Sequence, residues 1–256
     1  AFRQRLPSAI VEPAMFVLKH LWAGVFGGIL MLAIGLSALL WPAGWLVTRY
    51  DALFVMALAV QVVFVVLRLE TRDEIIALGV FSALGLGIEV FNTTRGTWVY
   101  PEAGVLALGN VPLFVGFMYA AVGLCVLRMI RIFQMRFAPF PPRSVALLLA
   151  ALIYANFFTQ HLWFDIRIGL FVASLVLFGR TRIWFTPMPG RRWWMPMLLS
   201  LFLAALGVWL AENLGSLTGT WLYHGQQIPE PVNLATLGSW YLFLCVALMV
   251  ALLVLP

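Results

Sequence analysis

The chain alternates between long apolar segments and short polar ones. Eight apolar segments lie between the polar interruptions, and each holds at most one charged residue. A helix needs about 20 predominantly apolar residues to cross a bilayer. The pattern therefore predicts an all-α, polytopic transmembrane bundle of about eight spans. The segments are residues 20–41, 52–67, 75–92, 110–130, 144–160, 168–179, 195–214 and 232–255.

The distribution of Lys and Arg predicts how the spans are oriented. Cationic residues accumulate on the cytoplasmic side of membrane proteins. With the N-terminus inside, 13 of the 16 Lys and Arg residues fall in cytoplasmic segments, and only Arg49, Arg95 and Arg167 fall outside. We therefore expect a multi-pass protein with both termini cytoplasmic. Residues 1–19 are interpreted as a cytoplasmic lead-in at the interface and not as a removed signal peptide. The sixth segment is short, and its flanking arginines would lengthen it by reaching the headgroups.

Composition narrows the class of protein further. Hydrophobic residues make up 63% of the 256 residues and charged residues 10%, whereas soluble domains contain about 25% charged residues. These values exclude a soluble globular chain and a disordered one. The net charge of +6 comes from loop arginines beside anionic headgroups, so the expected partners are membrane lipids and not nucleic acid. Cys125 and Cys245 lie inside apolar segments and predict no disulfide framework.

An internal repeat is the most informative feature of the sequence. Glu89 is followed by a Gly-Thr-Trp-x-Tyr motif that ends at Tyr100, and Glu212 is followed by the same motif ending at Tyr223. Two flanking patterns recur at similar offsets: Gly-x-x-Tyr at 116–119 and 238–241, and an aromatic–Asp pair at 50–51 and 164–165.

The repeat predicts a single membrane domain, residues 1–256, built from two four-span halves over about 20–132 and 144–255. Halves with an even number of spans enter the membrane in the same sense, so the repeats are expected to be parallel. Both motifs then lie at the outer face.

Glu89 and Glu212 are the first candidates for chemistry. A carboxylate inside a span is costly, so it usually faces the bundle interior and has a partner. The spacing predicts a tight turn that folds the Trp and Tyr of each motif back over its carboxylate. A carboxyl group in apolar surroundings holds its proton more strongly and can serve as a general acid. Equally, each Glu can fasten its own loop to the helix end, in which case the motif is architectural.

A second candidate is the pair His161 and Asp165. On a helix, residues i and i+4 share a face, so the two would ligate a metal, or Asp165 would fix the His161 tautomer in an acid–base pair. Asp51 occupies the repeat-equivalent position of Asp165, and a helix cap is the alternative for both. His224 would complete a mixed set with His161, Asp165 and Glu212 that suits Zn, Fe or Mn. No compact metal motif is present, so the cofactor stays open.

Tryptophan supplies possible walls for a site. Six of the 11 Trp residues stand at span ends and fit an interfacial belt, whereas four others accompany the outer-face carboxylates. An aromatic wall can stabilise a cation, whether an ammonium headgroup or a carbocation, and packing at a helix junction is the alternative. The expected substrate contacts are Trp98, Tyr100, Trp163, Trp221 and Tyr223, with Trp240 nearby.

Residues 161–167 (His-Leu-Trp-Phe-Asp-Ile-Arg), together with Phe185-Thr-Pro187 and Ala211-Glu212-Asn213, resemble a bacterial membrane family catalogued as domain of unknown function 817. The likeness covers nearly the whole chain and implies a multi-span helical protein of the bacterial cytoplasmic (inner) membrane, without an activity. A shorter stretch, 89–113, is similar to carotenoid hydratases, membrane enzymes that add water to an isoprenoid alkene. The Thr-Trp pair and the duplicated motif depart from that pattern.

Three functions fit these features. The expected one is an intramembrane enzyme that acts on a lipid or isoprenoid near the outer face, with Glu89, Glu212, His161 and Asp165 as acid–base residues. The alternatives are a transporter of a small molecule and a non-catalytic assembly subunit. A cavity shared by both Glu residues favours the enzyme, a path to both faces favours transport, and a solid core with each Glu satisfied in its own repeat favours the subunit. Substrate and oligomeric state are open.

Overall fold

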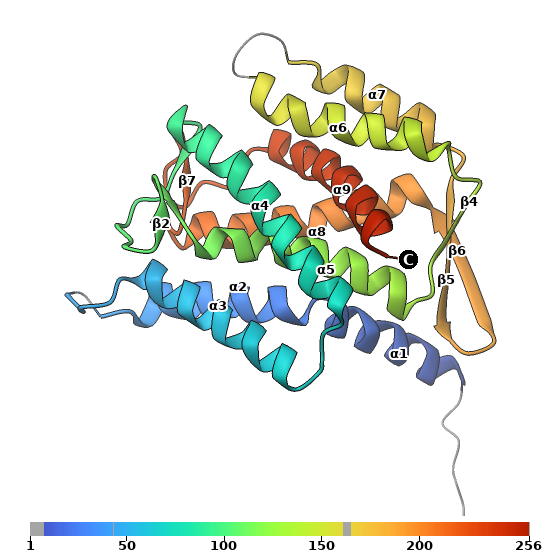
Figure 1. Cartoon of the computed structure of the whole chain (residues 1–256), viewed down its shortest axis with the longest axis horizontal. Coiled ribbons are helices and arrows are strands. Elements are labelled where there is room, and N and C mark those ends of the chain that lie inside the picture. The colour runs from blue at the N-terminus through green and yellow to red at the C-terminus, as the bar shows by residue number, and fades with distance from the viewer. Residues whose placement is uncertain (1–7, 43, 161–164, 256) are drawn as a thin grey trace, which may run out of the picture.

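The computed structural model describes residues 8–42, 44–160 and 165–255. Helices dominate this part of the chain (Figure 1), and each of the eight apolar segments contains one. The helices are α1 (Ser8–Ala23), α2 (Val25–Leu40), α3 (Arg49–Val66), α4 (Arg72–Thr94), α5 (Phe114–Ile132), α6 (Arg143–Thr159), α7 (Arg167–Phe178), α8 (Met197–Leu217) and α9 (Leu234–Val254). The strands are β1 (Trp98–Val99), β2 (Ala107–Leu108), β3 (Val111–Pro112), β4 (Arg136–Ala138), β5 (Arg182–Met188), β6 (Arg191–Pro196) and β7 (Leu222–Tyr223).

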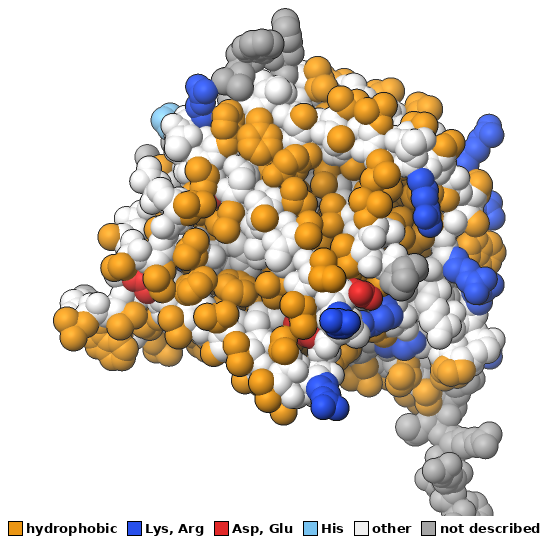
Figure 2. All heavy atoms as spheres, in the orientation of Figure 1, with side chains coloured by type: hydrophobic (Ala, Val, Ile, Leu, Met, Phe, Trp, Pro, Cys, Tyr) orange, Lys and Arg blue, Asp and Glu red, His pale blue; other side chains and the backbone are white. Residues whose placement is uncertain are grey.

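The surface of this bundle is that of a membrane protein. Helices α3, α4, α5, α8 and α9 are long and apolar enough to cross a bilayer, and the bent pair α1–α2 is a sixth candidate. Helices α6 and α7, with 17 and 12 residues, are shorter apolar helices. Large apolar side chains such as Ile168 (81% exposed) and Val176 (79%) stand on the surface, and Figure 2 shows apolar side chains over most of the helical face. Together with the candidate spans, so much exposed apolar surface indicates a protein surrounded by lipid.

The first apolar segment differs from the expected single helix over 20–41. The chain is already helical from Ser8, and the axis bends by 66° between α1 and α2. Gly24 lies at the bend with φ −93° and ψ 6°, and an added Cβ there would lie 3.9 Å from the Cys125 sulfur on α5. Helices kink where a small residue permits close approach. The bend places α1 against α5 and β5 instead of along α2.

Helices α5 and α9 form the centre of the molecule, and small residues let α4 approach α5 closely. A Cβ on Gly123 would lie 2.0 Å from Cδ2 of Phe81, and one on Gly85 would lie 2.2 Å from Cγ of Tyr119. Such contacts leave room only for glycine. The approach at Gly85 seats the Tyr119 ring against α4, one turn before Glu89.

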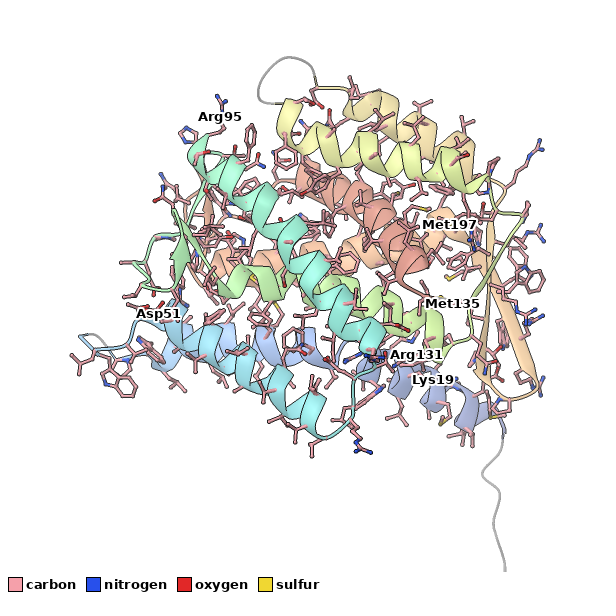
Figure 3. The ribbon with its side chains drawn as sticks, in the orientation of Figure 1. Lys19, Asp51, Arg95, Arg131, Met135 and Met197 are labelled. Atoms are coloured by element: carbon pink, nitrogen blue, oxygen red, sulfur yellow. The ribbon has the colours of Figure 1, made fainter. Side chains whose placement is uncertain are left out.

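A three-stranded antiparallel sheet, in the order β4–β5–β6, covers one end of the bundle. The sequence pattern predicts loops between the apolar segments here, and not paired strands. Alternate residues face the same side of a strand, so Arg136, Arg182, Trp184 and Trp194 share one face of the sheet. Most Lys and Arg side chains visible in Figure 2 lie toward this end. Figure 3 places Lys19 and Arg131 toward it as well, whereas Asp51 and Arg95 lie toward the opposite end.

Candidate functional site

The two Gly-Thr-Trp-x-Tyr motifs meet in space. Strands β1 and β7 pair antiparallel, with Trp98 opposite Tyr223 and Val99 opposite Leu222. Each motif leaves its helix through a left-handed glycine, Gly96 with φ 71° and Gly219 with φ 65°. A positive φ is readily adopted only by glycine, which explains why the motif begins with this residue.

Glu89 accepts three hydrogen bonds from aromatic side chains. Its Oε2 accepts from Trp98 Nε1 at 2.6 Å and from the Tyr100 hydroxyl at 2.8 Å. Its Oε1 accepts from the Tyr119 hydroxyl at 2.9 Å. The side chain is buried, with 6% of its surface exposed. The predicted turn that folds Trp and Tyr back over the carboxylate is therefore confirmed, and Tyr119 of α5 adds a donor that the motif alone did not specify.

Glu212 repeats the arrangement with one difference. Its Oε1 accepts from Trp221 Nε1 at 2.8 Å and from the Tyr223 hydroxyl at 2.7 Å. Within the described ranges no hydrogen bond to its Oε2 is found, although the residue is only 7% exposed. The buried indole Nε1 of Trp240 on α9 interacts with the Glu212 carboxylate, although in the described structure it does not reach hydrogen-bond geometry.

Both carboxylates line one cavity of about 330 Å³. Its walls come from α2, α4, α5, α6, α7, α8 and α9 and from the two motif strands, and they are mainly aromatic and aliphatic. The volume lies within the range of small-molecule sites. Polar or aromatic members of the wall are Thr97, Trp98, Tyr100, Tyr119, Phe157, Gln160, Arg167, Trp221, Tyr223, Thr236, Ser239, Trp240 and Phe243.

The motif tyrosines are suited to remain hydrogen-bond donors. Burial raises the pKa of Tyr100 and of Tyr223 well above the ordinary value, and the neighbouring carboxylates raise it further. Both phenols therefore keep their protons at neutral pH and continue to donate to the Glu oxygens.

The loops at the motif end of the molecule are tied to the bundle by the aromatic–Asp pair at residues 50–51. The Tyr50 hydroxyl donates to the Thr220 carbonyl at 2.7 Å. Asp51 accepts from the backbone N–H groups of Leu106 at 2.7 Å and Val105 at 3.0 Å. Thr48, and not Asp51, is the N-cap of α3. Asp51 therefore holds the loop that connects the first motif to α5, which corrects the expectation of a simple helix cap.

The second aspartate, Asp165, lies between α6 and α7 and is not on a helix. Its carboxylate accepts from the Arg167 backbone N–H at 3.0 Å and from Arg167 Nε at 2.8 Å. This hydrogen bonding with Arg167 lowers the pKa of Asp165. Asp165 is not among the residues that line the cavity.

The proposed metal set is not assembled within the described part of the chain. His161 and Trp163 lie outside the described residues. His224 is exposed, donates its backbone N–H to the Thr97 carbonyl and is absent from the cavity wall. No group of three or more His, Cys, Asp or Glu side chains gathers among the residues with described positions.

Comparison with known proteins agrees with this picture. The family model "Protein of unknown function (DUF817)" matches residues 12–248. The "Uncharacterized protein YoaT" of Bacillus subtilis (strain 168) is 36% identical over 204 residues, which cover 79% of this chain and 76% of that protein. The family match confirms the resemblance to domain of unknown function 817, and the relative is a bacterial protein.

Two solved structures share the fold. The structure of MvINS, a mycobacterial Insig homolog from Mycobacterium vanbaalenii, has a TM-score of 0.52 at 14% identity and covers 71% of this chain and 93% of its own. A cross-linked MvINS trimer gives a TM-score of 0.53 at 15% identity and covers 72% and 95%. At such identity the likeness concerns the fold alone. By the match over residues 12–248 and by the YoaT relative, the chain belongs to the DUF817 family.

Proposed function

We propose that this protein is an intramembrane enzyme that acts on a lipid or isoprenoid by carboxylate acid–base chemistry near the outer face of the membrane. The observation that carries the proposal is that Glu89 and Glu212, from opposite halves of the sequence, line the same cavity. Two ionisable groups inside a span are expensive to maintain. Their convergence on a space of ligand size favours a chemical role.

The two carboxylates are held differently, which suggests different roles. Both oxygens of Glu89 accept hydrogen bonds from Trp or Tyr donors. Glu212 has both described bonds on Oε1, so its Oε2 is available to a ligand. Pairs of titratable groups in unlike surroundings are typical of acid–base sites. We assign proton transfer to Glu212 and charge stabilisation to Glu89.

The proposal includes a membrane topology. Eight spans in two parallel repeats, with both termini on the cytoplasmic side of a bacterial inner membrane, agree with the pairing of β1 with β7 and with the clustering of cations toward the sheet end. In this arrangement the cavity opens toward the outer leaflet.

An assembly subunit is the second candidate, because each Glu is bonded by the Trp and Tyr of its own motif. Glu212→Gln separates the two functions. The Gln carbonyl oxygen still accepts from Trp221 and Tyr223, so the loop is retained, whereas the acid–base group is lost. If Glu212 is architectural, this variant is expected to behave like the wild type.

The test measures proton transfer to carbon. Membranes from a strain that lacks its own copy and expresses the wild-type protein are incubated in deuterated water, and non-exchangeable deuterium in the lipid extract is measured by mass spectrometry. We expect Glu212→Gln to lower the labelling by about 100-fold or more. The control, Glu230→Gln, changes an exposed carboxylate away from the cavity and is expected to label like the wild type. Wild-type labelling by Glu212→Gln would overturn the proposal, as would loss of its fold in detergent.

A further inference from the structure

The carboxylates of the cavity differ from Glu70 and Glu74, the buried carboxylates at the opposite end of the bundle, in the groups that neutralise their charge. At the opposite end, Glu70 and Glu74 have fully buried side chains and bind Arg128 at 2.7 and 2.8 Å, and Glu74 also binds Arg131 at 2.9 Å. Glu89 and Glu212 are nearly as buried, yet all of their described donors are neutral indoles and phenols. Buried charges in proteins are ordinarily paired.

The cavity wall supplies no free cation within the described ranges. Arg167 is the cationic residue on that wall. Its Nη2 lies 2.6 Å from Asp165 Oδ2 and its Nε 2.8 Å from the same oxygen. The charge of Arg167 is therefore already matched by a carboxylate that does not line the cavity. The wall retains an excess of negative charge whenever either Glu is ionised.

Aromatic rings surround these carboxylates. The ring centroids of Trp240 and Tyr119 are 5.7 Å apart, as are those of Trp240 and Phe243, and those of Trp98 and Tyr223 are 5.8 Å apart. Aromatic faces together with carboxylates are the surroundings that recognise substituted ammonium groups. The open Oε2 of Glu212 provides the anionic contact.

We infer that the cavity binds the ammonium group of a cationic amphiphile between Glu89 and Glu212, with the chain of the amphiphile against the aliphatic wall. The inference rests on the proposed function and names its substrate class. A hard metal ion suits the wall less well, because calcium takes six to eight oxygen ligands and the oxygens of Glu89 already accept indole and phenol hydrogens.

The test uses the full chain in a neutral maltoside detergent. The probe is hexyltrimethylammonium, with hexanol as the neutral comparison and hexanoate as the anionic one. Binding is followed by tryptophan fluorescence and by the shift in melting temperature. We expect saturable binding of the ammonium probe alone. Glu212→Gln and Glu89→Gln are each expected to weaken it by about tenfold or more, and Glu230→Gln to leave it unchanged.

A further variant keeps the inference testable if the Glu variants unfold. Trp240→Leu removes an aromatic ring from the cavity wall while both carboxylates stay, and we expect it to weaken binding of the ammonium probe several-fold. Equal responses of the wild type to all three probes, or unchanged affinity in the folded variants, would overturn the inference. Failure of ammonium binding with deuterium labelling still dependent on Glu212 would refute the substrate class and leave the enzyme proposal standing. Ammonium binding that depends on both Glu residues, with deuterium labelling that does not depend on Glu212, would refute the enzyme proposal and leave the ammonium site standing.

Discussion

Trp98 and Tyr223 face each other across β1 and β7, and each donates a hydrogen bond to a different glutamate. Trp98 binds Glu89 of its own half, and Tyr223 binds Glu212 of the other half. Because Val99 pairs with Leu222, the variable fourth residues of the two motifs are opposite one another. The pairing relates the two motifs by an approximate local two-fold axis. It also holds both carboxylates at the wall of the same cavity.

This pairing predicts a specific cross-link. Facing residues of antiparallel strands have Cα atoms about 4.5–5.5 Å apart, which lies within the range of about 4.4–6.8 Å that a disulfide needs. The double variant Val99→Cys, Leu222→Cys is therefore expected to form an intramolecular disulfide on mild oxidation. Mass spectrometry of the linked peptides is the measurement.

The control for the cross-link is Val99→Cys combined with Leu253→Cys. Leu253 is 65% exposed near the end of α9, and Figure 1 shows this end far from β7. No intramolecular link is expected there. The pairing of β1 with β7 is contradicted if the double variant Val99→Cys, Leu222→Cys forms no internal disulfide under conditions that oxidise exposed thiols.

Gly215 is expected to be required for the second motif. A Cβ at this position would lie 1.9 Å from Cη2 of Trp221, the indole that binds Glu212. Overpacking of a filled site costs about 1–3 kcal/mol, so Gly215→Ala is expected to lower the free energy of unfolding and to disturb Trp221 fluorescence. Gly207→Ala, in the same helix with nothing within 4 Å, should instead be neutral or stabilising by up to about 1 kcal/mol. Similar effects of both variants would exclude tight packing at Gly215.

The sequence could predict the helices and the two carboxylate motifs because both depend on local pattern. Apolar run length locates the helices, and repetition of the same spacing after Glu89 and Glu212 predicts the same turn twice. Orienting the halves by their arginines predicted that both motifs lie at the same face, whereas their direct contact is given by the pairing of β1 with β7. Tyr119 lies in the repeated Gly-x-x-Tyr pattern. Its hydrogen bond to Glu89, however, depends on the close approach of α5 to Gly85, which the pattern does not predict.

Other features depend on partners distant in sequence. Arg128 was counted as a cytoplasmic loop charge, although it is 1% exposed on α5 and binds residues near the start of α4. The strands β4, β5 and β6 are rich in Arg, and β5 and β6 also contain Trp. Such a composition resembles a polar interfacial loop until the three segments are seen to pair. The bend at Gly24 arises from packing of α1 on α5, and no local pattern encodes that contact.

Asp165 is expected to have a modest, pH-dependent effect on stability. The hydrogen bonds from Arg167 lower the pKa of Asp165 in the folded state. A lowered pKa contributes stability above the unfolded value, near 3.9, and the contribution is lost as the pH falls through the folded pKa. Because the side chain is 39% exposed, Asp165→Asn should cost less than about 1 kcal/mol at pH 7. Urea unfolding at pH 7 and at pH 3 measures this, and a difference that grows toward pH 3 would contradict the sign.

The ion network around Arg128 is expected to be the most sensitive polar feature of the fold. Arg128→Met leaves the carboxylates of Glu70 and Glu74 buried without their main partner, which typically costs about 3–5 kcal/mol. Arg131→Gln removes a cation that is 37% exposed and should cost less than about 1 kcal/mol. Unfolding of each variant in mixed micelles gives the two values.

A third variant separates loss of charge pairing from loss of packing at Arg128. Adding Glu70→Gln and Glu74→Gln to Arg128→Met removes the uncompensated charges while the side-chain volume stays similar. Replacement of a whole buried ionic cluster by neutral groups is often nearly neutral in free energy, so the triple variant should recover most of the stability lost in Arg128→Met. If it is no more stable than the single variant, the guanidinium acts through its packing against Phe64, whose ring centroid lies 5.7 Å from the Arg128 Cζ, and the electrostatic account of this end of the bundle is wrong.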